Sequence, residues 1–355
     1  MKVRHGKIST LVLFIVTCIT VVFVVVEMRS KMRVRTSGYE KKIAAADLAM
    51  RAFQEMKWAS DSLHIPMDRI NDPNETGLIG LQYSHLTTQR GDLNAKLTST
   101  NPNFAALIVQ LLSQAKVRER DVVAVSFTGS YPALNIAALC AFEVMNVEPI
   151  IVTSGGASMW GANFPDFTYL DMENILYQNG IVRNKTTSAT IGGEDDVGRG
   201  LSPEGRELIE TAIQRCDVDP LAPVNLEDAI EKRIDLYMAH DKVKIFLHIG
   251  EGSSWAGDYS SGLFRPRQVR SGSGLLERMS RMGITVINIM DVPALAADHD
   301  LPAAPTPLPL PGEGRLFYEY RYSVPLAIVF LSVLLFILFV VLRYDIDYYL
   351  RRRKK

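Results

Sequence analysis

Three serines are the side chains whose positions best suit a nucleophile. Ser130 follows the apolar run 122–127, and Ser154 and Ser158 belong to the stretch "VTSGGAS". A serine hydroxyl beside a base attacks carbonyl carbons, so the chemistry would be acyl transfer. None of the three matches GxSxG or begins an SxxK pattern. Ser130 and Ser158 are the candidate nucleophiles, and helix capping or loop formation is the structural alternative.

A base for these serines can be sought in one histidine and one acidic loop. His248 lies in an apolar run just before "GEGSS", and the alternative is a hydrogen-bonded core histidine. The loop "IGGEDDVGRG" holds Asp195 and Asp196 between glycines, which suits a carboxylate acid/base pair or a divalent-cation loop. Solvated loop acids are the alternative there. His248, Asp195 and Asp196 are candidate catalytic residues, and we expect neither a bound metal nor a cofactor.

Two Gly/Ser turns predict a binding edge. Backbone N–H groups at the start of a helix attract anions, and Pro132 marks such a start after the first turn. The patterns GxxxxGK[ST] and GxGxxG are absent, so a carboxylate suits the turns as well as a phosphate. The residues expected to line the binding site are Gly129, Ser130, Ser154, Gly155, Gly156, Gly250, Glu251 and Ser253.

The elements that position these turns form two similar strand–helix–strand units. The first has strands at 122–127 and 149–153, and the second has strands at 243–249 and 284–290. This order implies parallel strands joined by right-handed crossovers. Both turns then lie at the carboxyl edge of one sheet, where open α/β sheets bind ligands. The expected fold class is α/β, with a mostly parallel Rossmann-like sheet and flanking helices.

An apolar run lies near each end of the chain. Residues 8–26 and 324–342 each suit a transmembrane helix of about 20 residues, and tyrosines border the second run on both sides. The basic tail 343–355 follows the second run, so the positive-inside rule places it in the cytoplasm. Two spans place residues 1–7 in the cytoplasm as well, and the domain between the spans outside it.

The segment between the spans divides into three parts. Helical spacing without proline predicts a helical stalk at 27–63. An α/β domain follows at 64–297. Five prolines then favour an extended, polyproline-like linker at 298–315.

Charge and cysteine content narrow the environment of this domain. Residues 36–342 hold 26 Lys or Arg and 36 Asp or Glu, a net charge of −10, although the whole chain is neutral. Binding to nucleic acid depends on basic side chains, so nucleic acid is excluded as a partner. Cys140 and Cys216 would either pair in an oxidising compartment or remain as buried free thiols.

Several motifs, taken in order, resemble the poly-γ-glutamate system protein family of bacteria. They include "TGLIG", "SHLTTQRGDLNAKLTSTNPNFAAL", "VAVSFTGSYPALNIA", "VTSGGASMWGANFPDFTYLDME" and "IGGEDDVGRGL", and they cover about residues 75–290. The resemblance implies a role in synthesis or export of this extracellular capsule polymer at the bacterial cytoplasmic membrane. It implies poly-γ-glutamate or its precursor, and the membrane synthase subunits, as partners. No catalytic residue carries over from it.

These observations lead to three expected functions. Amide ligation needs cytoplasmic ATP, whereas the domain is expected outside and lacks a nucleotide motif, so ligation would belong to partner proteins. The first expectation is an accessory membrane-anchored component that handles the polymer at the extracytoplasmic face. The alternatives are an extracytoplasmic γ-glutamyl hydrolase or transferase with a serine nucleophile, and a structural subunit of the synthase complex.

Overall fold

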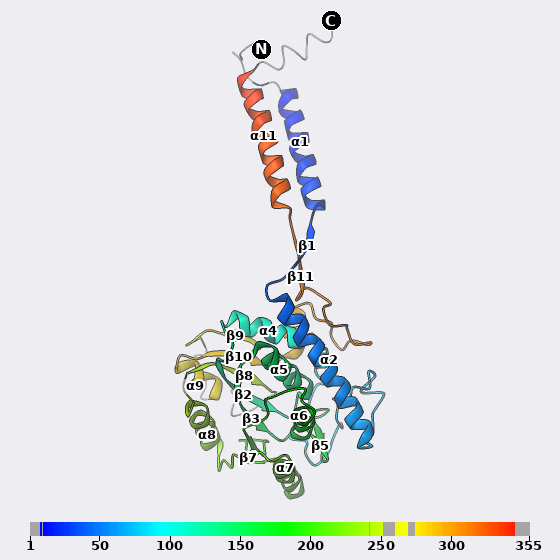
Figure 1. Cartoon of the computed structure of the whole chain (residues 1–355), viewed down its shortest axis with the longest axis vertical. Helices are drawn as coiled ribbons and strands as arrows, with labels where there is room; N and C mark the ends of the chain where they lie inside the picture. Colours follow the sequence, from blue (N-terminus) through cyan, green and yellow to red (C-terminus); the bar gives the residue numbers. More distant parts are fainter. Residues whose placement is uncertain (1–7, 9, 241, 251–259, 269–273, 345–355) are drawn as a thin grey trace. The chain divides into compact units, whose positions relative to one another are not determined.

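A seven-stranded sheet lies at the centre of the larger of two units (Figure 1). The computed structural model describes residues 8, 10–240, 242–250, 260–268 and 274–344. Residues Ser37–Phe317 form the larger unit, which we call the body. The two ends of the chain, Met1–Thr36 and Tyr318–Lys355, form the smaller unit, which we call the anchor.

The sheet of the body is mostly parallel, as the sequence predicts. Its strand order is β7-β6-β3-β2-β8-β10-β9, and only β9 at one edge runs antiparallel to its neighbour. The strands are β2 (Val122–Thr128), β3 (Glu148–Ser154), β6 (Ser188–Thr190), β7 (Asp219–Pro220), β8 (Val243–Ile249), β9 (Gly262–Phe264) and β10 (Thr285–Ile289).

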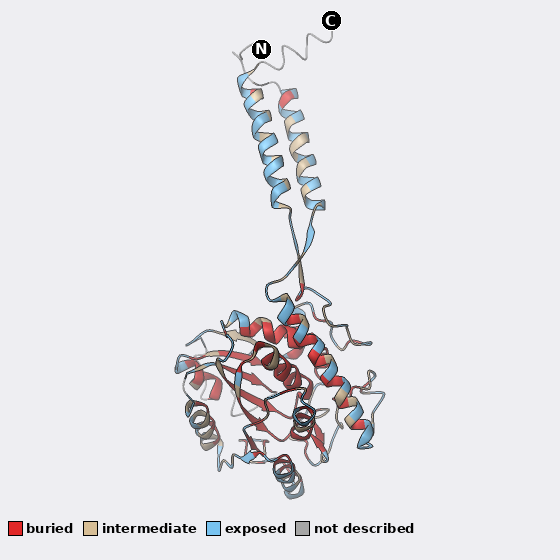
Figure 2. Ribbon diagram, viewed as in Figure 1, coloured by how far each residue is buried: buried red, intermediate tan, exposed pale blue. Residues whose placement is uncertain are grey.

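The chain winds outward from β2 in both directions. It passes first through α5 (Pro132–Met145) to β3, and later through α9 (Leu275–Arg281) from β8 to β10. Right-handed crossovers in opposite directions place their helices on opposite faces of a sheet. Accordingly, α9 and α8 (Leu226–Met238) bury apolar side chains against Ala124, Phe246 and Val286, and α4 (Phe104–Gln114) packs with α5. Figure 2 shows the sheet as the most buried part of the body.

Helix α2 (Tyr39–Ser62) divides the segment that the sequence predicts as one stalk at 27–63. The first apolar helix ends at Arg29, a short strand follows, and Gly38 adopts a φ of +72°, a conformation that glycine tolerates best. Helix α2 then packs against α4 and α5. Its buried face includes Ala45, Ala49, Ala52, Phe53 and Met56.

The Pro-rich segment 298–315 belongs to the body and lies against it, instead of forming a free spacer. Asn74 Nδ2 donates to the Pro305 carbonyl at 2.7 Å, and Asn103 Nδ2 donates to the Leu310 carbonyl at 3.1 Å. Side chains of the body thus satisfy these two carbonyls of the Pro-rich segment. Shorter elements complete the body: α3 (Leu93–Ser99), β4 (Asn163–Phe164), β5 (Phe167–Thr168), α6 (Tyr169–Gln178), α7 (Pro203–Arg215) and α10 (Val292–Asp298).

The anchor consists of two apolar helices and a two-stranded ribbon. Helices α1 (Thr10–Arg29) and α11 (Val324–Arg343) are long and apolar enough to cross a membrane. They lie side by side, with the rings of Phe23 and Phe330 stacked at 4.4 Å (Figure 1). Strands β1 (Met32–Arg35) and β11 (Tyr318–Arg321) pair antiparallel at one end of the helix pair. Both ends of the body therefore connect to the same end of the anchor.

Candidate functional site

The two predicted turns follow neighbouring strands at the point where the winding direction reverses. Strand β2 leads into Gly129 and Ser130, and β8 leads into Gly250. In doubly wound sheets the crevice outside such a reversal is the usual ligand site. A methyl group on Gly250 would lie 2.7 Å from the Thr128 side chain, so glycine is required for this close approach of the two strand ends. Glu251 and Ser253 lie outside the described residues.

The first Gly/Ser turn is covered by the segment that follows β3. Gly129 N–H donates to the Ser154 carbonyl at 3.0 Å, and the Ser158 N–H donates to Ser130 Oγ at 3.1 Å. A methyl group on Gly129 would lie 3.0 Å from the Gly156 carbonyl oxygen. The structure thus brings most of the predicted site residues together, and all of these are buried: Gly129, Ser130, Ser154, Gly155, Gly156 and Ser158.

A lysine that the sequence analysis missed lies beside both candidate nucleophiles. Lys96 Nζ donates to Ser158 Oγ at 2.7 Å and to the Ser130 carbonyl at 2.8 Å, and it lies 3.7 Å from the centre of the Tyr131 ring. Its side chain is buried, on a helix that Asp92 caps. Because Lys96 and Ser158 are 62 positions apart, no local motif signals the pair.

The chemistry of this pair depends on the charge of the lysine. A neutral lysine next to a serine is a known arrangement for nucleophilic catalysis. A carbonyl oxygen and an aromatic face both favour the charged ammonium, which donates a hydrogen bond and cannot accept the serine proton. These contacts make Lys96 a bridge that fixes the 155–163 loop over the Gly/Ser turn.

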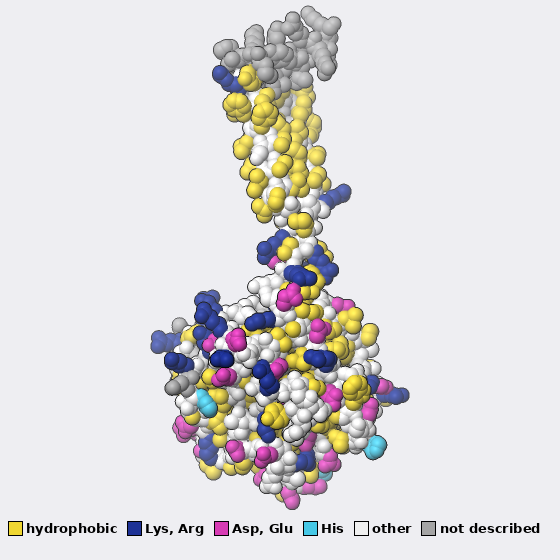
Figure 3. Space-filling view, viewed as in Figure 1, with side chains coloured by type: hydrophobic (Ala, Val, Ile, Leu, Met, Phe, Trp, Pro, Cys, Tyr) yellow, Lys and Arg dark blue, Asp and Glu magenta, His cyan; other side chains and the backbone are white. Residues whose placement is uncertain are grey.

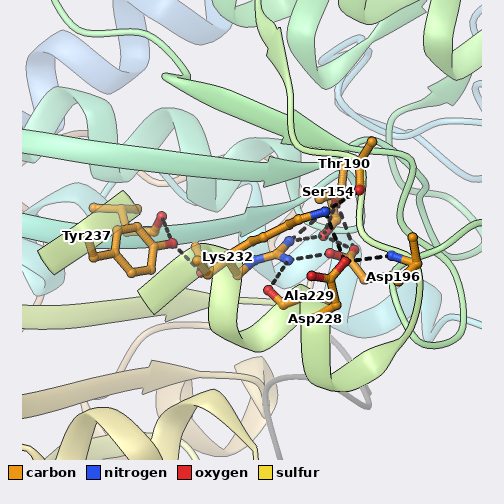
Figure 4. A network of polar contacts seen from close by, with 12 residues as sticks. Ser154, Thr190, Asp196, Asp228, Ala229, Lys232 and Tyr237 are labelled. Atoms are coloured by element: carbon orange, nitrogen blue, oxygen red, sulfur yellow. Dashed lines mark hydrogen bonds and ion pairs between the residues drawn. The ribbon is translucent and has the colours of Figure 1, made fainter. Parts of the chain in front are cut away.

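Asp196 forms a buried ion pair at the carboxyl ends of β3 and β6. Its Oδ1 accepts hydrogen bonds of 2.8 Å from Ser154 Oγ and from Thr190 Oγ1, and its Oδ2 pairs with Arg233 of α8. Arg233 also donates to Ser154 Oγ at 3.1 Å. Figure 4 shows Ser154, Thr190 and Asp196 converging at this network. A buried carboxylate needs such compensation, so the contacts account for Asp196 as a structural anion.

The neighbouring acid has a different environment. Asp195 pairs at 2.5 Å with Arg199, whose side chain is 59% exposed. Across the described ranges, no group of three or more His, Cys, Asp or Glu is arranged to hold a metal ion. Asp195 and Asp196 therefore each have an arginine partner in place of a shared cation.

His248 lies in a row of polar side chains that crosses the middle of the sheet. Ser126 of β2, His248 of β8 and Asn288 of β10 are register partners, so all three point to the same face, and all are fully buried. Burial, and to a lesser degree the charge of Arg233, lowers the pKa of His248 to about 3. The imidazole is neutral at physiological pH and is a poor base for a serine. Ser126 and Asn288 were missed because each is a single polar residue within an apolar strand.

An open hollow lies away from these buried groups. It has a volume of about 390 Å³ and includes Arg51 and Trp58 of α2, and Trp58 is 58% exposed. Glu55 in the same hollow accepts a 2.7 Å hydrogen bond from Asn179 Nδ2. The remaining lining residues are Leu48, Gln54, Gly180 and Ile181. The hollow offers a guanidinium and an indole to a molecule in solution.

The comparisons with known proteins identify no relative. No protein family, no curated protein and no solved structure matches the chain. The geometry of the body and of the anchor is therefore the basis of the functional argument, together with the motifs described above.

Proposed function

We propose that this protein is an accessory, membrane-anchored component of poly-γ-glutamate synthesis or export, which handles the polymer at the extracytoplasmic face of the bacterial cytoplasmic membrane. The ordered motifs that resemble the family support the pathway. The anchor and the open hollow of the body support the mode of action.

The observation that carries the proposal is the pairing of the two chain ends in the anchor. Strands β1 and β11 join α1 and α11 at one end, so a membrane crossed by both helices has the whole body on one side. The basic residues after α11 assign the opposite side to the cytoplasm. The body would then meet the polymer where it leaves the membrane.

The open hollow is the part of the body that best suits contact with the polymer. Poly-γ-glutamate carries one carboxylate per residue, and an arginine binds carboxylates through charge-assisted hydrogen bonds. Arg51 is exposed in the hollow, whereas Gly129 and Ser130 of the first Gly/Ser turn are buried beneath the segment that follows β3. Glu55 lies in the same hollow, where Asn179 donates a hydrogen bond to its carboxylate, so the attraction of the polymer would depend on direct contact with the Arg51 guanidinium and not on a net positive charge of the hollow.

Protease protection in spheroplasts tests the proposed orientation. With a tag on each end of the full chain, external protease should cleave the body and leave both tags intact. Loss of either tag before lysis would contradict the orientation. In a bacterium that makes the polymer, deletion of the protein should change the amount or the length of surface polymer, and unchanged polymer would contradict the pathway.

The hydrogen bond between Lys96 and Ser158 favours one second candidate, an extracytoplasmic γ-glutamyl hydrolase or transferase. Lys96 in its neutral form would take the Ser158 proton as Oγ attacks a γ-amide carbonyl, and would then return it to the departing amine. Water or another amine would release the acyl group from Ser158. We rank this candidate second because the contacts of Lys96 favour its charged form, which cannot accept that proton, and because Ser158 has no exposed surface and its loop would have to move.

Polymer length separates the two candidates. If the protein is a hydrolase, the full chain in nanodiscs shortens poly-γ-glutamate and Ser158→Ala abolishes the shortening. The control Ser113→Ala, at an exposed serine of α4, does not. Unshortened polymer in the presence of the wild-type chain would exclude the hydrolase.

A further inference from the structure

One face of the β1–β11 ribbon carries cations and tyrosines in alternation. The register pairs Arg33 with Tyr320 and Arg35 with Tyr318, so these four side chains lie on the same face. The guanidinium of Arg33 lies 3.5 Å from the centre of the Tyr318 ring, and Lys31 Nζ lies 4.9 Å from that of Tyr322. These contacts extend the alternation toward the helices. We call Lys31, Arg33, Arg35, Tyr318, Tyr320 and Tyr322 the cation–tyrosine face.

The acidic side chain of the ribbon, Glu319, lies on the opposite face. Glu319 pairs in register with Val34, and Arg321 pairs with Met32, so both lie on the other face, where they form an ion pair with each other. Within β1 and β11, Glu319 is the only acid. Lys31 and Arg33 of the cation–tyrosine face therefore carry positive charge that no acid of β1 or β11 on that face neutralises.

The ribbon starts directly at the ends of the two apolar helices. Lys31 lies two residues beyond the end of α1, and Tyr322 lies two residues before the start of α11. The interfacial layer on each side of a bilayer is about 5–8 Å thick, and a strand rises about 3.3 Å per residue. Counted from the end of α1, Lys31 lies about 7 Å out, within this layer, and Arg33 lies about 13 Å out, where only its long side chain reaches toward the phosphates. In Figure 3, dark blue Lys and Arg side chains gather over the ribbon beside the yellow surface of the helix pair.

We propose that the cation–tyrosine face binds the phosphate groups of anionic phospholipids, with Arg33 as its central ligand. A guanidinium that stacks on a tyrosine keeps its N–H edge for bidentate contact with a phosphate. Tyrosine side chains are enriched at the depth of the lipid headgroups. Charge, ring type and position all agree with a headgroup, and the proposal needs only that the anchor lies in a membrane.

Spin-labelled lipids test the proposal on the full chain. Reconstituted in phosphatidylcholine vesicles, the wild-type protein should bind labelled phosphatidylglycerol more strongly than labelled phosphatidylcholine of the same acyl chains. Arg33→Gln should lower this preference roughly fivefold, the share of one cation near the membrane surface. The matched control Arg321→Gln, on the opposite face of the same ribbon, should change it less than twofold. High salt should weaken the wild-type preference.

Other results would overturn the proposal. An equal preference in wild type and Arg33→Gln would do so, as would an equal loss in Arg33→Gln and Arg321→Gln. Binding of soluble poly-γ-glutamate that depends on Arg33, with no preference for phosphatidylglycerol, would assign the face to the polymer instead. Arg33→Lys is the control for misfolding. It keeps the positive charge and should therefore retain most of the preference for phosphatidylglycerol.

Discussion

Arg233→Met should destabilise the body far more than Arg199→Met. Arg233 and Asp196 are both fully buried, and methionine would leave the Asp196 carboxylate with two hydroxyl donors and no cation. Removal of one partner from a buried ion pair costs about 3–5 kcal/mol. Arg199 pairs with the neighbouring Asp195 near the surface, where the same substitution should cost at most about 1 kcal/mol.

Urea unfolding of the full chain in detergent, followed by tryptophan fluorescence, measures this difference. All three tryptophans lie between residues 37 and 317, so the signal reports on the body and not on the apolar helices. The double variant Arg233→Met with Asp196→Asn should cost less than the sum of the single variants, because it removes both charges. A cost below about 1 kcal/mol for Arg233→Met would refute the role given to this ion pair.

Three further predictions concern other buried groups of the body. Burial raises the pKa of Glu173 from its usual value of 4.5 to about 7. The protonated carboxyl therefore stabilises the fold fully below pH 4.5, and this contribution is lost as the pH rises through 7. Urea unfolding at a series of pH values should show this loss in wild type and not in Glu173→Gln. Lys96→Met should cost about 1–3 kcal/mol, because the Ser130 carbonyl loses a buried donor, whereas the control Lys57→Met, at a half-buried surface pair, should cost under about 1 kcal/mol in the same assay. Cys140 and Cys216 are free and buried, and burial raises the pKa of both thiols, so iodoacetamide should label them only after unfolding; a mass that shows a Cys140–Cys216 disulfide would contradict this.

The central strands and their turns could be predicted because their signals are local. Apolar runs followed by glycine and serine, with Pro132 at the next helix start, locate β2, α5 and β3 to within one or two residues. The apolar helices α1 and α11 were predictable for the same reason, since length and composition suffice. In each case neighbours in the sequence determine the element.

The parts that could not be predicted depend on contacts between distant segments. The sequence at Gly38 does not show that α2 is separate from the first apolar helix and packs within the body. That placement depends on the contacts of α2 with α4 and α5. Lys96 reaches Ser158 across 62 positions, and Arg233 reaches Asp196 from another helix. The sequence around Asp196 therefore resembles a cation-binding loop, whereas in the fold the Asp196 carboxylate is a structural anion paired with Arg233. Only the contacts in the fold distinguish these two roles.

Binding of labelled poly-γ-glutamate to the full chain in nanodiscs tests the central claim most directly. The account predicts saturable binding without shortening, and it predicts that Arg51→Gln weakens this binding about tenfold, as expected for loss of one charge-assisted contact. Lys57→Gln, on the same helix but outside the hollow, should leave it unchanged. The absence of saturable binding to the wild-type chain would contradict a role in handling the polymer.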